Sequence, residues 1–335
     1  MAYRIDLTKS LSKEFKRVGL EQIAACQVRL GARLGARVGK PGHADGGVAD
    51  GGVADGGVHD VRKGLKRIRA LIVLAAPALG ADAARHERHR YRDLGRMLAE
   101  RRDRDVLLRT IAAIDTQFGL GANGPTASVA RALQASGERP GMGVMSSRVG
   151  LGLERAAVAM AALDFSAADN KALIAALQGT YQDGRDGLRR ARRDGDDETL
   201  HDWRKSVQLH WRHMRLVGDV WPGECDARMQ AARLLSQQLG AHNDLGLLTT
   251  FVQQAKRGDV PRRDRDLVLQ FVAIAQKQLR RSVRPLGHIL FAETAPSFGG
   301  RFAAYYRRGR KVWAKSSKSQ DKVVVDRLTV RKGGR

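Results

Sequence analysis

Hydrophobic residues recur every three or four positions along most of the chain, which is the period of an amphipathic α-helix. Runs that alternate apolar and polar residues, as half-buried strands do, are scarce. The pattern predicts an all-α protein. Its expected helices cover residues 8–38, 59–76, 82–108, 148–162, 169–193, 201–217, 224–239, 244–257, 262–284 and 297–314, with Pro77 and Pro285 as helix stops.

One helical stretch occurs twice. The first copy runs from His59 to Arg69 and the second from His201 to Arg212, and both begin with His-Asp-x-Arg-Lys. Each copy is followed by an Asp in a similar setting, Asp103 after the first and Asp244 after the second. The two His residues lie 142 positions apart and the two Asp residues 141 apart. A shared offset of roughly the size of a domain indicates a duplicated unit.

In both copies the basic residues share one helix face, opposite an apolar face. The first copy places there His59, Arg62, Lys63, Lys66 and Arg69, and the second His201, Arg204, Lys205 and Arg212. Solvated faces normally mix acidic with basic residues, because like charges four positions apart destabilise a helix. Asp60 and Asp202 are expected to lie off these faces. We therefore interpret the two basic faces as binding surfaces for a polyanion.

Neighbouring helices carry further basic stripes. Helix 82–108 is expected to present on one face Arg85, Arg88, His89, Arg92 and Arg96. Further candidates are Arg185, Arg189, Arg233, Lys277 and Arg281. At an offset of 141, Arg92 corresponds to Arg233, but His89 and Arg96 correspond to Gln230 and Gln237. The second half is therefore expected to bind anions more weakly.

The two motifs together resemble the CHAD family, the histidine α-helical domains. They are His-Asp-x-Arg-Lys, continued by His-Trp-Arg-His-Met-Arg-Leu-Val at residues 210–217, and the downstream Leu-x-x-x-Arg-Asp and Leu-Gly-x-His-Asn-Asp segments. The resemblance covers roughly residues 8–315. It implies two pseudo-symmetric antiparallel four-helix bundles, a basic central groove and bound inorganic polyphosphate. Gln208 and Leu209 stand where the family usually has a Lys and a polar residue.

This organisation predicts a first bundle over residues 8–145, a second over 146–314 and a basic disordered tail over 315–335. Three Ala-Asp-Gly-Gly-Val units precede His59. Their Gly pairs cost too much backbone entropy for a regular element, so we expect a flexible linker over residues 41–58. A calcium loop would need a denser acidic pattern and a terminal Glu.

Composition narrows the choice of partner. The 335 residues include 60 Lys and Arg against 35 Asp and Glu, a net charge of +25. Such an excess favours polyphosphate, nucleic acid or an anionic membrane. Aromatic residues are only 5% of the chain, which gives little support to base stacking. No apolar run of 18 residues or signal-peptide core is present, so we expect no membrane span and a cytoplasmic protein, with polyphosphate granules as a candidate location.

Other chemistry fits the residues less well. Gly119 to Gly124 matches G-x-G-x-x-G but follows a predicted helix, so we interpret it as a loop. The pairs His86/His89 and His210/His213 are embedded in Arg, which disfavours a metal site, and His210 is expected to be a hydrogen-bonded core residue. Cys26 and Cys225 suggest free thiols. No catalytic residue and no cofactor are predicted.

Asp103 and Asp244 could be acid–base catalysts, but we expect them to orient neighbouring Arg or His side chains. Three functions stay open. The first is non-enzymatic polyphosphate binding, the second is a nucleic-acid-associated protein whose tail binds much of the ligand, and the third is a metal-dependent enzyme that processes polyphosphate. The third would need more carboxylates to hold Mg²⁺.

Overall fold

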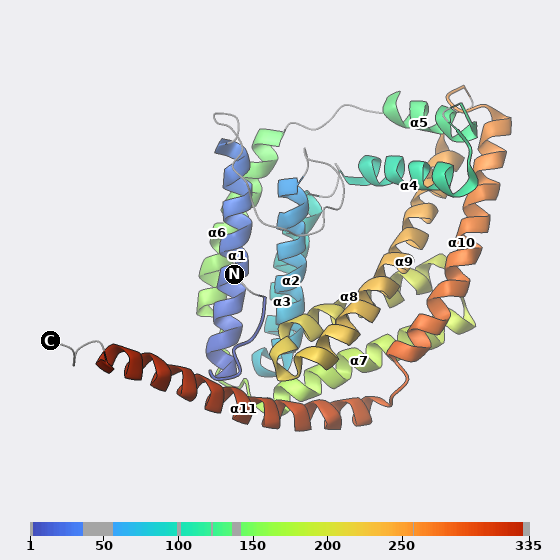
Figure 1. Cartoon of the computed structure of the whole chain (residues 1–335). Helices are drawn as coiled ribbons and strands as arrows, with labels where there is room; N and C mark the ends of the chain where they lie inside the picture. The colour runs from blue at the N-terminus through green and yellow to red at the C-terminus, as the bar shows by residue number, and fades with distance from the viewer. Residues whose placement is uncertain are drawn as a thin grey trace.

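A computed structural model describes residues 3–35, 56–98, 102–121, 123–135, 142–256 and 258–330. The side chains of residues 32–35, 56, 102–103, 142–145 and 313–330 lie outside that description. Over the described residues every regular element is a helix, which confirms the predicted all-α fold. Figure 1 shows two groups of helices that meet along α2, α7 and α8.

The elements follow one another with short connections. They are α1 (Leu11–Gly35), α2 (Gly56–Leu79), α3 (Ala81–Met97), α4 (Arg102–Phe118), α5 (Pro125–Ala135), α6 (Met142–Ala162), α7 (Asn170–Arg193), α8 (Asp197–Leu216), the 3₁₀ turn η1 (Gly218–Val220), α9 (Pro222–Gln254), α10 (Arg262–Leu290) and α11 (Ala295–Val330).

The two halves use corresponding packing partners. In the first half, α1 packs on α2 and α6, and α2 packs on α3. In the second half, α7 packs on α8 and α11, and α8 packs on α9. Helix α2 also contacts α7 and α8, and one hydrophobic core runs from Leu65 of α2 to Trp203 of α8. The halves are therefore joined through a shared interior.

Helix α6 packs with the first half, although the predicted boundary at 145/146 assigned nearly all of it to the second. Val149 and Leu153 are buried in the core beside α1 and α3. A Cβ at Gly152 would lie 2.3 Å from Leu94 Cδ2, so the absence of a side chain lets α3 and α6 approach closely. The change of packing partners falls after α6, in residues 163–169.

Helices α4 and α5 leave the first half and pack on α9 and α10. They form a second hydrophobic core there, in which Ile114 and Val129 meet Leu248 and Val272. The sequence did not predict α5, a helix that Pro125 opens directly after the Gly119–Gly124 turn. Gly119 and Gly121 have positive φ in that turn, which agrees with its interpretation as a loop.

The helix break occurs in the opposite half from the one predicted. The expected helix 82–108 is two helices, since α3 ends at Met97 and α4 begins at Arg102. The expected helices 224–239 and 244–257 are one, α9. The break allows α4 to turn away from α3 toward α9 and α10. This long-range packing is invisible to local periodicity.

Neither proline ends its helix where the sequence predicted. Helix α2 continues past Pro77 to Leu79, and α10 continues past Pro285 to Leu290. In α10 Gly287 and Leu290, which follow the proline, are buried, and a Cβ at Gly287 would lie 2.5 Å from the Trp203 ring. Tertiary contacts thus outweigh the backbone hydrogen bond that Pro285 removes.

The described parts of the two segments that were predicted to lack structure are helical. The backbone of α11 is helical to Val330, through most of the predicted tail 315–335. Of the predicted linker 41–58, residues 41–55 lie outside the described residues. Residues 56–58 belong to α2.

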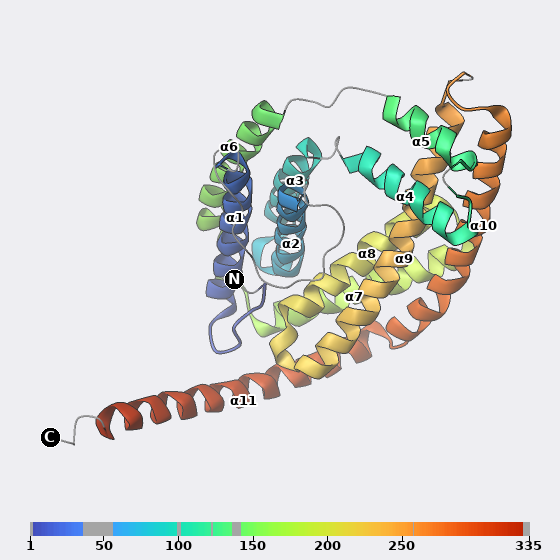
Figure 2. The ribbon, with the colours of Figure 1, turned by 45° about the horizontal axis from the view of Figure 1, so that its top comes forward.

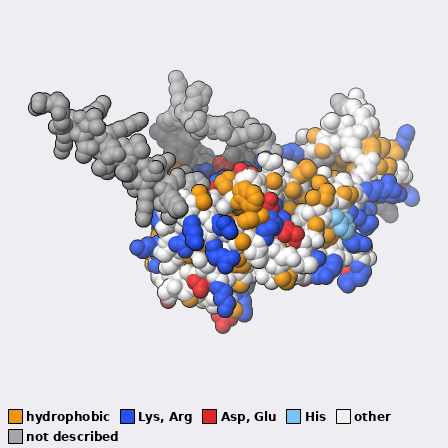
Figure 3. All heavy atoms as spheres, turned by 60° about the horizontal axis from the view of Figure 1, so that its bottom comes forward, with side chains coloured by type: hydrophobic (Ala, Val, Ile, Leu, Met, Phe, Trp, Pro, Cys, Tyr) orange, Lys and Arg blue, Asp and Glu red, His pale blue; other side chains and the backbone are white. Residues whose placement is uncertain are grey.

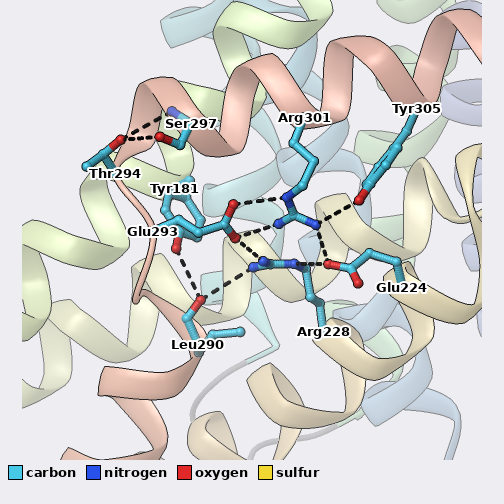
Figure 4. A network of polar contacts seen from close by, with 9 residues as sticks. All are labelled: Tyr181, Glu224, Arg228, Leu290, Glu293, Thr294, Ser297, Arg301 and Tyr305. Carbon is cyan, nitrogen blue, oxygen red and sulfur yellow. Dashed lines mark hydrogen bonds and ion pairs between the residues drawn. The ribbon is translucent and has the colours of Figure 1, made fainter.

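A network of two Arg and two Glu residues fastens α11 to the body (Figure 4). Arg228 Nε donates to Glu224 Oε1 (2.8 Å), and Arg301 bridges Glu224 Oε1 (2.6 Å) and Glu293 Oε2 (3.0 Å). Burial would raise the pKa of Glu224, but hydrogen bonds from Arg301 and Arg228 outweigh it and hold the pKa below its usual value. These half-buried pairs anchor the start of α11 to α9.

Candidate polyanion-binding site

Arg69 of α2 is the centre of a cluster of like charges. The guanidinium is half-buried, and three arginines of α3 lie close enough to repel it, namely Arg88, Arg92 and Arg96. Burial lowers the pKa of Arg69, and these three neighbours lower it further, opposed only by Asp93. The predicted basic faces of α2 and α3 are therefore adjacent.

Arg212 of α8 extends this cluster into the second half. Burial lowers its pKa to about 10, and Arg67, Arg69 and Arg204 add to the effect, while the buried Tyr3 opposes it. Its Nη1 donates to the Gln208 carbonyl of the preceding turn (2.8 Å). We name this cluster the cationic junction, defined as Arg67, Arg69, Arg88, Arg92, Arg96, Arg204 and Arg212.

Sequence reasoning missed Arg67, which it assigned to neither face of the helix. In the structure its guanidinium lies over the Tyr3 ring (5.7 Å) and donates to Gln22 Oε1 (3.3 Å). Burial lowers its pKa, and Arg215 lowers it further. The one sequence feature that could have identified Arg67 was its position next to the predicted basic face. Only the packing of α8 on α2 shows that Arg67 lies near Arg212.

His213 holds α8 against α2 and thereby builds the junction. Its Nε2 lies 2.9 Å from the Ala70 carbonyl of α2, and its Nδ1 lies 3.2 Å from Thr180 Oγ1 of α7. Burial lowers the pKa of His213 to about 4, so the ring is neutral at pH 7 and its Nε2–H donates to Ala70. One buried side chain thus fixes three helices that surround the site.

Acidic residues do join the predicted basic faces, contrary to expectation. Lys63 Nζ lies 4.0 Å from Asp60, and Lys205 Nζ lies 2.7 Å from Asp202, each three positions away. Four more ion pairs lie on predicted ligands. Three join residues three positions apart and one joins adjacent residues, namely Arg85–Asp82, Arg96–Asp93, Arg189–Asp186 and the adjacent Arg92–Asp93. Exposed pairs of this kind contribute little stability, so a phosphate chain can displace the carboxylates.

Arg62 and Arg204 occupy equivalent positions and both reach the backbone of the next helix. Arg62 Nη1 donates to the Leu98 carbonyl (2.9 Å), and Arg204 Nε donates to the Ser236 carbonyl (3.4 Å). Arg204 also packs over Gly240, where a Cβ would lie 3.1 Å from Nη2. These two predicted ligands therefore have a structural role that the sequence did not indicate.

The two motif histidines lie in different environments. His59 lines a cavity of about 530 Å³ between α4, α9 and α10, together with Asp244. His201 is half-buried and hydrogen-bonds to the Asn243 side chain. Burial lowers the pKa of His201, and Lys205 lowers it further. His201 thus lies on the cationic face and is neutral at pH 7.

The orienting role predicted for the two aspartates finds no support in the described contacts. Asp244 forms no hydrogen bond or ion pair with any residue that the structure describes, and instead faces the cavity. The Asp103 side chain lies outside the described residues.

The remaining predicted ligands lie partly on the helices of the junction and partly on other helices. Lys66 is half-buried on α2, His89 is exposed on α3, and Arg185 is half-buried on α7. Arg233 is exposed on α9, and Lys277 and Arg281 are exposed on α10. Helix α10 packs on α9, α5, α4 and α7, and its two candidates lie away from α2 and α3. The structure thus concentrates the site on α2, α3 and α8.

The histidine pairs considered as metal ligands are separated by their environments. His86 is exposed beside Arg90 (3.2 Å), whereas His210 is fully buried among Tyr181, Phe291 and Phe298. His210 is a core residue, as predicted, but its ring nitrogens have no hydrogen-bond partner among the described residues. Within that same part of the chain, no three His, Cys, Asp or Glu side chains gather into a metal-binding group.

Two further sequence expectations bear on the site's surroundings. Cys26 and Cys225 are both buried and free. None of the described helices is long and apolar enough to cross a membrane.

Comparisons with known proteins agree with this architecture. The crystal structure of the CHAD domain from the plant Ricinus communis matches with a TM-score of 0.57 and 18% identity, over 86% of this chain and 95% of that one. PptA from Streptomyces chartreusis matches with a TM-score of 0.53 and 16% identity, over 83% of this chain and 97% of that one. No curated protein gives a significant sequence match. The sequence profile of the CHAD domain matches residues 33–253, and the chain therefore belongs to the CHAD family.

Proposed function

We propose that this protein binds inorganic polyphosphate at the cationic junction and does not process it. The observation that carries the proposal is the proximity of two largely buried cations, Arg69 and Arg212, which lie within electrostatic range of each other and of further arginines on α2, α3 and α8. Burial and mutual repulsion both make these cations costly in the free protein. A bound polyanion relieves both penalties through charge-assisted hydrogen bonds.

The arrangement favours a phosphate chain over a single phosphate or a stacked base. The cations extend along three helices, so a chain with a charge on each unit can contact several at once. The nearby aromatic rings, Tyr3 and Trp211, are engaged by Arg67 (5.7 Å) and Arg212 (5.4 Å). Recognition through charge alone needs no base contact.

A competition titration at physiological salt tests the proposal. Long-chain polyphosphate should displace a labelled short polyphosphate far more effectively than duplex DNA or orthophosphate does. Removing residues 315–335 should leave that affinity within about threefold, because salt screens distant exposed charges. Equal displacement by DNA, or loss of binding on truncation, would favour a nucleic-acid role for the tail.

The nucleic-acid alternative rests on α11 and the residues after it. From Arg301 onward the sequence has 12 Lys and Arg against two Asp, and α11 extends beyond the body in Figure 1. An enzymatic role is tested separately by incubating the protein with polyphosphate and Mg²⁺. We expect no release of phosphate and no shortening of the chain.

Binding at polyphosphate granules follows as a prediction for the cell. A fluorescent fusion should gather where polyphosphate gathers. The R92E/R96E variant, which lacks two cations of the junction, should not.

A further inference from the structure

A second cationic cluster lies on α11, outside the junction. Arg307, Arg308, Arg310 and Lys311 line an open pocket of about 630 Å³ together with Asn170, the first residue of α7. We name these four cations the α11 cluster. Figure 3, which brings the lower side of Figure 1 forward, shows Lys and Arg gathered in patches on this side of the molecule with few acidic side chains between them.

The α11 cluster differs from the junction in its acidic neighbours. The faces near the junction contain pairs such as Lys63–Asp60 and Arg96–Asp93. None of the four α11 cations forms an ion pair with any residue that the structure describes. Four like charges within five helical positions repel one another, and no internal carboxylate compensates.

The position of the cluster is fixed by close packing. A Cβ at Gly309 would lie 2.7 Å from the Val220 carbonyl oxygen, so the glycine lets α11 press against η1. Arg310 turns back to the body, where its Nε donates to the Leu7 carbonyl (3.1 Å). Arg307, Arg308 and Lys311 are exposed. The N-terminus of α7 beside them adds a favourable field for an anion.

Helix α7 separates the two cationic surfaces. It contacts α11 on one side and α2 and α8 on the other, and α11 lies below it in Figure 1. Because the Arg228–Glu293–Arg301 network fastens α11 to α9, this separation is held by the fold. The α11 cluster and the cationic junction therefore lie on different helices, and α7 packs between α11 and the junction helices α2 and α8.

From this geometry we infer that the α11 cluster is a second polyphosphate site, and that one protein molecule bridges two chains or two distant segments of one chain. The inference rests on the proposed function of the junction. With two sites, one protein molecule can cross-link polyphosphate chains. A protein with the junction alone could only coat a chain.

A bridging assay tests the inference with the full-length protein. Biotinylated polyphosphate on beads captures the protein, excess protein is washed away, and a fluorescent polyphosphate chain is added. The wild-type protein should retain the second chain. The variant R307E/R308E/K311E should bind a short chain within about twofold of wild type, be captured normally, and retain at least fivefold less of the second chain.

A matched control reverses three exposed cations at the opposite end of the second half, K256E/R262E/R263E, and changes the net charge equally. This variant should bridge like the wild type. Circular dichroism checks that both variants fold, and gel filtration checks that each remains in the same oligomeric state as the wild type.

The possible outcomes separate the two proposals. No short-chain binding by the wild type would contradict the junction. Normal short-chain binding without bridging, or bridging that survives R307E/R308E/K311E, would overturn the second site alone. Retention of labelled duplex DNA in preference to the second polyphosphate chain would also overturn it, in favour of a nucleic-acid surface on α11.

Discussion

Helices α2 and α8 carry the same motif, but the structure uses them differently. The inner side of α2 beyond the motif is apolar, with Ile68 and Leu71 buried, and its basic side faces the arginines of α3. At the corresponding positions, 142 residues later, α8 buries His210 and His213. Helix α8 thus has buried histidines where α2 has apolar side chains, and one of them, His213, bonds to the backbone of α2.

The helices next to α2 and α8, which are α3 and α9, also differ in their basic residues. Helix α3 surrounds Arg69 with three arginines, whereas α9 has Gln237 where α3 has Arg96. The most buried cation of α8, Arg212, lies within electrostatic range of Arg67 and Arg69 in the first half. The proposed site is therefore one cluster of cations at the contact of the halves, and the repeated motif does not give two equal clusters.

The largest expected effect compares α3 with α9 directly. R92E/R96E should weaken polyphosphate binding roughly 100-fold, since each charge-assisted contact is worth about 1.5 kcal/mol or more. The variant R233E/Q237E changes the counterpart positions and should cost less than about tenfold. Isothermal titration with one short chain measures both. Equal losses would show that the halves contribute alike.

The buried histidines should make the second half sensitive to acid. Burial lowers the pKa of His210 to about 3, while the unfolded side chain titrates near 6.5. The unfolded state therefore binds the proton first, and the stability present above pH 6.5 is lost as the pH falls toward 3. At pH 4.5 His210 alone should cost roughly 2 to 3 kcal/mol of unfolding free energy.

His210→Leu tests this because the His210 ring has no described hydrogen-bond partner to lose. Its unfolding free energy at pH 7 should equal or exceed that of the wild type. The loss between pH 6.5 and 4.5 should be smaller. Ile68→Val in α2 is the matched first-half control and should leave the pH slope unchanged. An unaltered slope in His210→Leu would contradict the assignment.

Arg62 and Arg204 should differ in their contribution to stability. Arg62 donates to the carbonyl of Leu98, the residue that caps α3, where no later turn of the helix supplies a partner. Arg204 donates to Ser236 within the continuous helix α9. Thermal or urea unfolding should show a loss of about 1–2 kcal/mol for Arg62→Ala and under about 1 kcal/mol for Arg204→Ala. The reverse order would argue against a capping role for Arg62.

The smallest effect concerns His201. Burial and Lys205 lower its pKa in the free protein, and a bound polyanion should raise it. The complex then takes up a proton, so affinity should rise severalfold from pH 8 to pH 6. His201→Gln should flatten this dependence in titrations at several pH values. Binding that weakens toward pH 6 would contradict the sign of this linkage.

The sequence by itself determined the elements and the chemistry of their faces. Helical period, the duplicated His-Asp-x-Arg-Lys motif and the basic stripes depend on residues within two or three turns of each other. They sufficed to identify the all-α fold, the family, and most members of the cationic junction, among them Arg69, Arg92 and Arg212.

Only the tertiary structure decided which faces meet. The assignment of α6 to the first half, the separation of α3 from α4, and the proximity of Arg69 to Arg212 all follow from burial between segments far apart in the chain. The hydrophobic period of one helix does not predict which other helix it packs against. The same limit explains why only the folded molecule shows the ion pair of Lys205 with Asp202 and the α11 cluster, whose cations form no ion pair with any described residue.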